Sequence, residues 1–324
     1  MKGLLYIFIH MDTFLYLGKL AAALIVGMLA AQLFGRKRFV KQTALTQTFL
    51  VYLLLFFMGV NTGSIDGIVA QFGTIGLSAF LLTLISVLGT VVLSFGVSLL
   101  IGKDKRPLEV AIAPRKEQSL IRRIYDIVKE PLFLVGIVFF GLVLRLTTPF
   151  FSWYQSSWVS YLLYAMLFCV GMGLVQKQIS FKGVFTDTGI LLLPLYTILG
   201  SYLGVLLTPL LTPYTIKEGM GMVSGFGWYS LSGIMISDLG FPILGSISFL
   251  TNLLRESFSF FLVPFFGRLG NRFYAPAVCT SGATSMDVTL VLLSSHFGTR
   301  TIISSIYHGV VMSLIAPLLI PLFF

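Results

Sequence analysis

Four charged side chains stand among apolar residues in the C-terminal third of the chain, residues 219–308, and are the first candidates for chemistry. They are Asp238, Arg255, Glu256 and Asp287. A carboxylate at membrane depth is costly unless it is paired or hydrated, so such an acid is a candidate for binding a cation or carrying a proton. For Asp287 the structural alternative is a helix cap, because Thr284, Ser285 and Asp287 are all capping residue types.

Arg255 and Glu256 are neighbours in the run FLTNLLRESFSFF. Adjacent residues on a helix project about 100° apart, so each is expected to meet different partners. Arg255 suits a substrate carboxylate or the charge of Asp287, and Glu256 suits a cation or a proton; a structural ion network is the alternative for both. Asp238 is expected at the end of its segment, near water. His308 could shuttle protons, although a hydrogen bond to a neighbouring helix is the simpler interpretation.

Two runs of small residues interrupt the apolar sequence around these charges. They read GFGWYSLSG at residues 225–233 and CTSGATSMD at residues 279–287. Glycine permits unwinding and close backbone approach, and hydroxyl groups supply hydrogen bonds. Packing between apolar helices also uses small residues, which is the alternative interpretation. The candidates are Gly225, Gly227, Gly233 and Gly282 for unwinding, and Tyr229, Ser230, Ser232, Thr284 and Ser285 for binding a substrate or proton.

The composition is that of a membrane protein. The chain has 324 residues, of which 56% are hydrophobic and 10% charged, against about 25% charged residues in a soluble domain. Apolar runs of about 20 residues recur along its length, as spanning helices require. We therefore predict an all-α, polytopic integral membrane protein with a single domain over residues 1–324. The two cysteines are far apart, and no motif for a metal site or a cofactor is present.

The basic residues predict an orientation in the bilayer. The net charge is +10, but Lys and Arg gather in short loops, which favours topology over nucleic-acid binding. Basic residues at 36–41 and at Lys177 and Lys182 are expected in the cytoplasm. Residues 103–130 carry eight Lys or Arg and read as a cytoplasmic linker that ends in an amphipathic helix. Trp153, Tyr154 and Trp158 suit an outside turn. Both termini are then expected outside.

The apolar segments give about eight spans and two interrupted segments, ten in all. The first six spans are expected at residues 14–34, 43–60, 72–101, 131–148, 157–175 and 189–211. The last four segments can be threaded in two ways. If all four cross, Arg268 and Arg272 fall outside; if 219–241 and 275–293 are broken or re-entrant, they fall inside together with Arg300, which fits the charge rule better. Such segments must face protein or water to satisfy their backbone.

Two segments share a local pattern. LLFFMGV at residues 54–60 and MLFCVGM at 166–172 each place aromatic residues ahead of a glycine, Gly59 or Gly171. The loop charges make them run in opposite directions, as in the inverted repeats of secondary transporters. Chance similarity between apolar segments explains so short a match equally well.

The longest motifs resemble a known family. MVSGFGWYSLSGIMISDLG, LRESFSFFLVPFF, CTSGATSMDVTLVLL and IYHGVVMSLIAPLLIP are similar to the lysine exporters of bacterial inner membranes, closely over residues 219–321 and more loosely before. The resemblance implies a transporter, not an enzyme, that exports L-lysine and its toxic thia-analogue. It implies that Asp287 is the family's intramembrane acid and that Arg255 and Glu256 are its Arg-Glu pair. Asn252 falls where relatives can carry Asp. The family is more remotely similar to cation/proton antiporters and bile-acid transporters, whose fold uses crossed, unwound helices.

Lysine export against an inside-negative potential needs a driving force. Moving one positive charge outward costs about 2.3 kcal/mol per 100 mV, and importing one proton per lysine removes that cost. We therefore predict lysine/proton antiport by alternating access, with Asp287 binding the ammonium and the proton in turn.

Three alternatives to lysine export stay open. An Na⁺/H⁺ or other small organic ion carrier would use the same fold. An intramembrane hydrolase using Ser230 or Ser232 with His308 is disfavoured, because the GxSG pattern of rhomboid-type proteases is absent. A scaffold without transport activity would tolerate loss of Asp287.

Overall fold

The computed structural model describes residues 2–35, 38–65, 67–101, 120–151, 155, 157–176, 187–298 and 301–324. Within these residues every regular element is helical, which confirms the all-α fold class. The basic and aromatic residues Arg36, Lys37, Trp153, Tyr154, Lys177, Lys182 and Arg300, and residues 103–119 of the linker, lie outside the described residues. The orientation that they predict stays a prediction, as does the single domain over residues 1–324.

The first group of helices consists of α1 (Lys2–Leu33), α2 (Val40–Gly63), α4 (Leu120–Thr147) and α5 (Ser157–Gln176). It packs as two parallel pairs, α1 with α5 and α2 with α4, and the two pairs run in opposite directions. Glycines allow the backbones to touch: a Cβ on Gly59 would lie 2.0 Å from the Val138 carbonyl oxygen, and one on Gly171 would lie 2.1 Å from that of Leu24. Gly59 and Gly171 thus occupy corresponding places in the two pairs. An inverted repeat over the whole chain stays a prediction.

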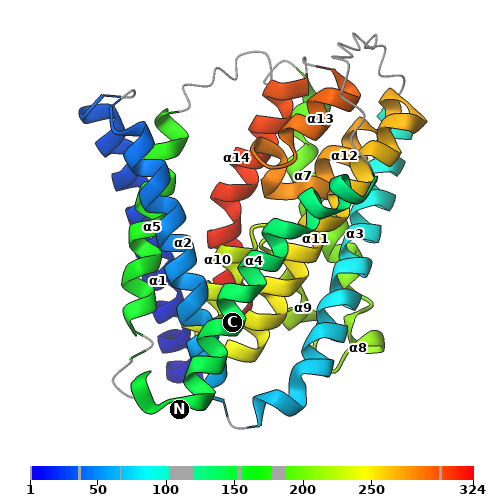
Figure 1. Ribbon diagram of the computed structural model, residues 1–324. Helices are drawn as coiled ribbons and strands as arrows, with labels where there is room; N and C mark the ends of the chain where they lie inside the picture. Colours follow the sequence, from blue (N-terminus) through cyan, green and yellow to red (C-terminus); the bar gives the residue numbers. More distant parts are fainter. Residues whose placement is uncertain are drawn as a thin grey trace.

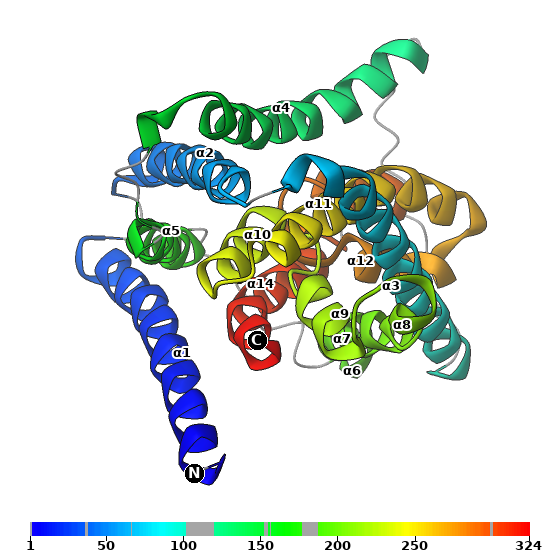
Figure 2. The ribbon, with the colours of Figure 1, turned by 90° about the horizontal axis from the view of Figure 1, so that it is seen from below.

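The second group contains α3 (Phe72–Ile101), α7 (Leu193–Val205), α11 (Pro242–Leu269) and α14 (Thr301–Leu319), with the short helices between them. These short helices are η1 (Ile68–Gln71), α6 (Thr188–Leu191), α8 (Thr208–Leu211), η3 (Asn271–Phe273) and η5 (Ile320–Phe323). A further short helix, η2 (Pro149–Phe151), follows α4 and lies beside the first group. In Figures 1 and 2, α1, α5, α2 and α4 form an outer row beside the more compact second group.

Residues 216–238 fold back on themselves as a hairpin of α9 (Ile216–Val223) and α10 (Tyr229–Asp238). Both Met222, near the end of α9, and Ser232, near the start of α10, accept hydrogen bonds from Asn252 in the middle of α11. A Cβ on Gly245 would lie 2.1 Å from the Ser237 hydroxyl, so α10 ends beside the start of α11. The chain therefore enters from the lower side of Figure 1, turns at mid-height and returns to that side.

A second hairpin enters from the upper side and consists of α12 (Tyr274–Ser281), η4 (Gly282–Met286) and α13 (Leu290–Phe297). The end of α13 returns to the upper side, because His296 lies beside Gly267 near the upper end of α11: a Cβ on Gly267 would lie 2.7 Å from the Cβ of His296. The threading with two re-entrant segments from opposite sides is thus the one that the structure adopts. The loop charges favoured it, but the contacts with α11 establish it.

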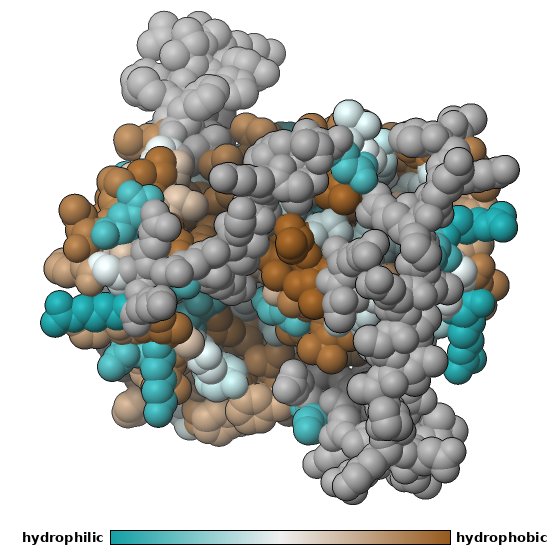
Figure 3. All heavy atoms as spheres, turned by 90° about the horizontal axis from the view of Figure 1, so that it is seen from above, coloured by the Kyte–Doolittle hydropathy of each residue, from teal (hydrophilic) through white to brown (hydrophobic). Residues whose placement is uncertain are grey.

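The outer surface suits a bilayer. By length and composition, four of the described helices could cross a membrane: Val40–Gly63, Ile68–Leu99, Trp158–Gln176 and Thr301–Phe323. Large apolar side chains such as Leu33 and Val291 are well exposed, and apolar atoms reach the rim of the molecule in Figure 3. The chain is an integral membrane protein, and the total of eight spans stays a prediction.

Two element boundaries differ from those expected. Helix α4 begins at Leu120, so the amphipathic segment and the fourth span form one continuous helix. The sixth apolar segment is divided into α6, α7 and α8. Pro194 and Pro209 stand in the first turns of α7 and α8. Proline lacks the N–H that would continue the preceding helix but fits a helix start, which explains these divisions.

Candidate functional site

The two hairpin tips meet in the middle of the second helix group. The Ala283 N–H in the second tip donates a hydrogen bond of 2.9 Å to the Phe226 carbonyl in the first. Gly282 has φ +59°, and a Cβ there would lie 1.9 Å from the same carbonyl oxygen. The glycine is required both for its left-handed backbone and for this close approach. The sequence correctly placed the two breaks, and the fold brings them into direct contact.

We expect Gly282→Ala to separate the tips and to lower the lysine efflux that the sequence motifs predict by at least about tenfold, because the added methyl group would clash with the Phe226 carbonyl and alanine disfavours a positive φ. The measurement is efflux of labelled lysine, with the amount of protein in the membrane checked in parallel. Gly240→Ala is the matched control: Gly240 also has a positive φ of +97° but no atom within 4 Å of the added Cβ. Equal losses in both variants would show that backbone strain, and not the contact between the tips, explains the effect.

Asn252 holds the first tip. Its side chain is buried in α11, and its Oδ1 accepts a 2.9 Å hydrogen bond from the Gly227 N–H within the break. Its Nδ2 lies 2.9 Å from the Met222 carbonyl and 3.0 Å from the Ser232 hydroxyl. One amide side chain thus contacts the end of α9, the break and the start of α10. An Asn supplies both the acceptor and the donors that these groups need.

Arg255 holds the second tip from the next turn of α11. It is 2% exposed, and its guanidinium donates to the carbonyls of Cys279 (3.0 Å) and Thr280 (3.2 Å) in the last turn of α12. It also donates to the hydroxyls of Ser201 and Thr90, at 2.9 and 3.3 Å. These acceptors are all neutral oxygens. A cation at the C-terminus of a helix is favoured by the helix dipole, which accounts for this arrangement.

Ser285 and His308 connect the second tip to α14. The Ser285 hydroxyl donates to the Ser305 carbonyl at 2.9 Å and lies 2.9 Å from His308 Nδ1. His308 is fully buried, and its Nε2 lies 2.8 Å from the Thr197 hydroxyl of α7. Thr284 donates to the carbonyl of Ser281 within the tip, at 2.8 Å. These contacts fit the simpler interpretation of His308, a hydrogen bond between neighbouring helices.

Asp287 lies at the end of the second tip and is exposed. Its Oδ1 accepts a 2.6 Å hydrogen bond from the N–H of Val288. Glu256, by contrast, is 5% exposed within α11. The structure therefore places an exposed carboxylate at the end of the second tip and a buried one within α11. Arg255 donates its hydrogen bonds to other groups than Asp287.

The first tip contains the remaining candidates. Tyr229 packs edge-on against Phe249, with ring centroids 5.9 Å apart, and Ser230 is buried. A Cβ on Gly225 would lie 2.6 Å from that of Ser232, and one on Gly233 would lie 2.7 Å from that of Phe249. These two glycines let α9, α10 and α11 pack closely, which was the alternative interpretation of the motif.

Asp238 lies away from the tips, at the interface between the two helix groups. It accepts hydrogen bonds from the hydroxyls of Tyr16 in α1 (2.9 Å) and Ser160 in α5 (2.6 Å). Sequence reasoning did not identify Tyr16 and Ser160, which are 222 and 78 residues away from Asp238. No local pattern carries information about such contacts.

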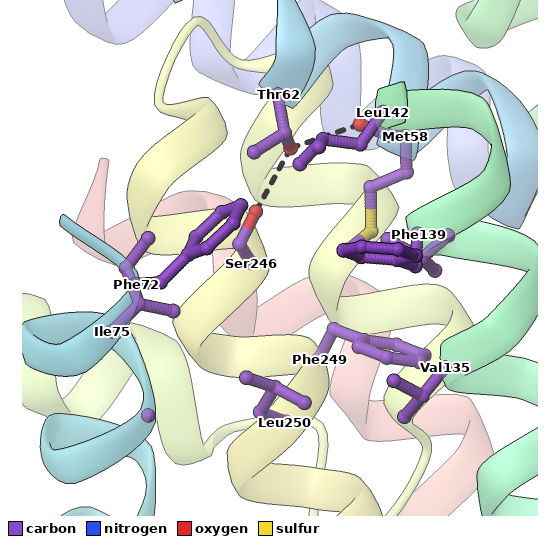
Figure 4. Close-up of a pocket in the computed structure, with 12 residues that line it drawn as sticks. Met58, Thr62, Phe72, Ile75, Val135, Phe139, Leu142, Ser246, Phe249 and Leu250 are labelled. Carbon is purple, nitrogen blue, oxygen red and sulfur yellow. Dashed lines mark hydrogen bonds between the residues drawn. The ribbon is translucent and has the colours of Figure 1, made fainter. Parts of the chain in front are cut away.

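One cavity among the described residues lies elsewhere and is apolar. It has about 230 Å³ and is lined by α2, α3, α4 and α11 (Figure 4). Its two hydroxyl groups, on Thr62 and Ser246, are 2.9 Å apart and bonded to each other. No charged side chain lines it, so it does not suit a charged substrate. Among the described residues, no group of three His, Cys, Asp or Glu side chains could hold a metal ion.

Comparison with known proteins identifies the family. The family model for the lysine exporter LysO matches residues 133–324, more than half of the chain. The chain belongs to the lysine exporter LysO family. It is 30% identical to "Lysine exporter LysO" of Escherichia coli over 279 residues, which is 85% of this chain and 88% of the relative. It is 31% identical to a "Putative lysine exporter" of Haemophilus influenzae over 197 residues, which is 59% of this chain and 96% of that protein.

Membership of the LysO family makes the chain an amino-acid transporter and not an enzyme. The matched region includes both hairpins, α11 and α14, and therefore every candidate site residue. No solved structure matches the chain.

Proposed function

We propose that this protein exports L-lysine, and its analogue thialysine, in exchange for protons across the bacterial inner membrane. The observation that carries this proposal is the exposed carboxylate of Asp287 at the place where two broken hairpins meet. The names of the relatives, lysine exporters, support the choice of substrate. Both termini lie in the lower half of Figure 1, in keeping with the proposed orientation, in which that side faces outward.

The hairpin junction offers complementary charges to a zwitterionic amino acid with an additional ammonium group. Helices α10 and α13 both begin at the junction, and their N-cap residues, Trp228 and Thr289, make no side-chain capping hydrogen bond. The first N–H groups of a helix attract anions, as at the broken helices of other transporters. We assign the substrate carboxylate to these helix ends, the start of α10 in particular, and an ammonium group to Asp287.

Proton exchange supplies the driving force. An inside-negative potential opposes release of a cation by about 2.3 kcal/mol per 100 mV. An ionised Asp287 binds the ammonium, and a protonated Asp287 returns empty. One acid that serves both ligands in turn couples lysine exit to proton entry without a second site.

Alternating access requires relative movement between parts of the protein. We propose that the second helix group, which contains both hairpins, moves against the first. Side-chain hydrogen bonds join the groups at Asp238 with Tyr16 and Ser160, and at Thr62 with Ser246. Apolar side chains such as Met58 and Phe249 dominate the cavity between the groups, and such surfaces can slide with little loss of hydrogen bonding.

The test is transport by the purified protein in liposomes preloaded with labelled lysine. We expect efflux to accelerate when the outside is made acidic and unlabelled external lysine to exchange with the internal label. A carrier of another organic ion with the same fold would show neither acid-accelerated lysine efflux nor exchange with external lysine. If external Na⁺ and not external acid accelerates the efflux, the coupling ion is Na⁺ and not the proton.

A further inference from the structure

Helix α11 contacts both hairpins through polar side chains: Asn252 and Ser248 reach the first, where Ser248 donates to the Met222 carbonyl at 2.7 Å, and Arg255 reaches the second. Asn252 and Arg255 are three residues apart, so they lie on the same face of the helix, one turn apart. Asn252 contacts only the first hairpin and its own helix. Arg255 contacts the second hairpin and the adjacent helices α3 and α7. Neither side chain is more than 2% exposed.

Both side chains satisfy backbone groups that the breaks leave without helical partners. The last carbonyls of a helix have no N–H partner within it, and each such group costs several kcal/mol at membrane depth unless another donor reaches it. The carbonyl of Met222, in the last turn of α9, accepts a hydrogen bond from Nδ2 of Asn252. The carbonyls of Cys279 and Thr280, in the last turn of α12, accept hydrogen bonds from the guanidinium of Arg255. Two hairpins from opposite sides are therefore stabilised by one helix.

We propose that Asn252 and Arg255 are positioning residues of the transport site, which hold the two tips in the geometry that binds the substrate. The proposal rests on the transport function proposed above and adds residues that do not themselves touch the substrate. Arg255 fixes the backbone at Thr280, seven residues before Asp287, and the tip in between is bonded to Phe226 of the first hairpin. The position of the Asp287 carboxylate thus depends on Arg255, whereas the start of α10 depends on Asn252.

The test compares Asn252→Ala and Arg255→Lys with the wild type by two measurements. Hydrogen exchange followed by mass spectrometry reports local opening of each tip. We expect faster exchange at residues 222–228 in Asn252→Ala and at residues 279–287 in Arg255→Lys, with exchange in α1 and α2 unchanged. In liposomes we expect the KM for lysine to rise by about tenfold, since buried hydrogen bonds that hold a tip are lost in each variant.

Ser259→Ala is the matched control. Ser259 is buried on the same helix, but its hydroxyl donates only to carbonyls of α11, those of Arg255 and Glu256. We expect wild-type exchange at both tips and a wild-type KM. Should Arg255→Lys fail to accumulate in the membrane, Ser201→Ala removes one guanidinium acceptor and leaves the arginine in place; faster exchange at residues 279–287 is again expected.

Unchanged exchange at the tips, or exchange that rises equally throughout the protein, would overturn the positioning role. A normal KM in variants whose tips open faster would overturn it as well. A wild type that carries no lysine would instead refute the proposed function, and the exchange rates would still decide whether the two residues hold the tips.

Discussion

Asp287→Asn should abolish proton-driven lysine efflux. Asparagine has no charge for the ammonium group and no titratable proton, so both proposed roles of the residue are lost at once. Loss of a hydrogen bond to a charged partner costs about 1.5–3 kcal/mol, which alone lowers binding by about tenfold to 150-fold. Since the coupling proton is lost too, external acid should no longer accelerate any residual efflux. The measurement is initial efflux from preloaded liposomes at two external pH values.

The control for Asp287→Asn is Glu218→Gln, which neutralises another acid of the same helix group. Glu218 forms a capping box with Thr215 at the start of α9, at the surface of the protein. Its substitution should change efflux by less than about twofold, because the loss of one capping interaction costs about 1 kcal/mol of local stability at most at an exposed site. Proton-accelerated efflux in Asp287→Asn would move the coupling proton to another acid, of which the buried Glu256 is the next candidate.

A disulfide between the helix groups should stop transport reversibly. Thr62 of α2 and Ser246 of α11 have hydroxyl oxygens 2.9 Å apart and lie in the two different groups (Figure 4). Thr62→Cys with Ser246→Cys replaces a hydroxyl pair by a thiol pair of similar size and leaves neither partner without the other. Oxidation should lower efflux to the background of preloaded liposomes without protein. A reducing agent should restore it, because the two helix groups can then move again. The native Cys169 and Cys279 are both buried and are replaced first.

The controls separate the movement between groups from the chemistry of oxidation. Either single cysteine variant should be insensitive to the oxidant. A second pair, Thr43→Cys with Gln176→Cys, lies within the first group, where Nε2 of Gln176 is 3.3 Å from the hydroxyl oxygen of Thr43. Its oxidation should leave efflux unchanged. Full activity in the oxidised Thr62–Ser246 pair would show that lysine is transported without separation of these helices.

Much of the architecture follows from local features of the chain. Apolar runs identify membrane helices because the bilayer selects their length, and α3 spans the same residues, 72–101, that hydropathy predicts. Gly227 and Gly282 identify the breaks because glycine adopts a positive φ at little cost, and both have one. Phe226 in the first break also has a positive φ, of +48°, which the sequence did not indicate. The motif around Asp287 identifies the family. These are properties of single segments, which require no knowledge of their neighbours.

The partners of the polar residues required the tertiary structure. From the sequence we expected Arg255 to bind a substrate carboxylate or Asp287. In the fold it donates to the carbonyls of Cys279 and Thr280 in α12, which are 24 and 25 positions further along the chain. Asp238 was expected at a helix end near water; it does end α10, but the fold places its carboxylate against Tyr16 of α1. The hydropathy and helical periodicity of a segment do not depend on which helices pack against it, so they cannot identify these partners.

The sequence by itself therefore determined the class of protein, the positions of the two breaks and the acid that lies beside one of them. Only the tertiary structure decided that each broken segment returns to its own side, that the tips bond to each other, and that α11 holds both. The physical reason is the range of the interactions. Helix formation and membrane burial depend on residues a few positions apart, whereas the contact between the tips joins residues 57 positions apart, Phe226 and Ala283.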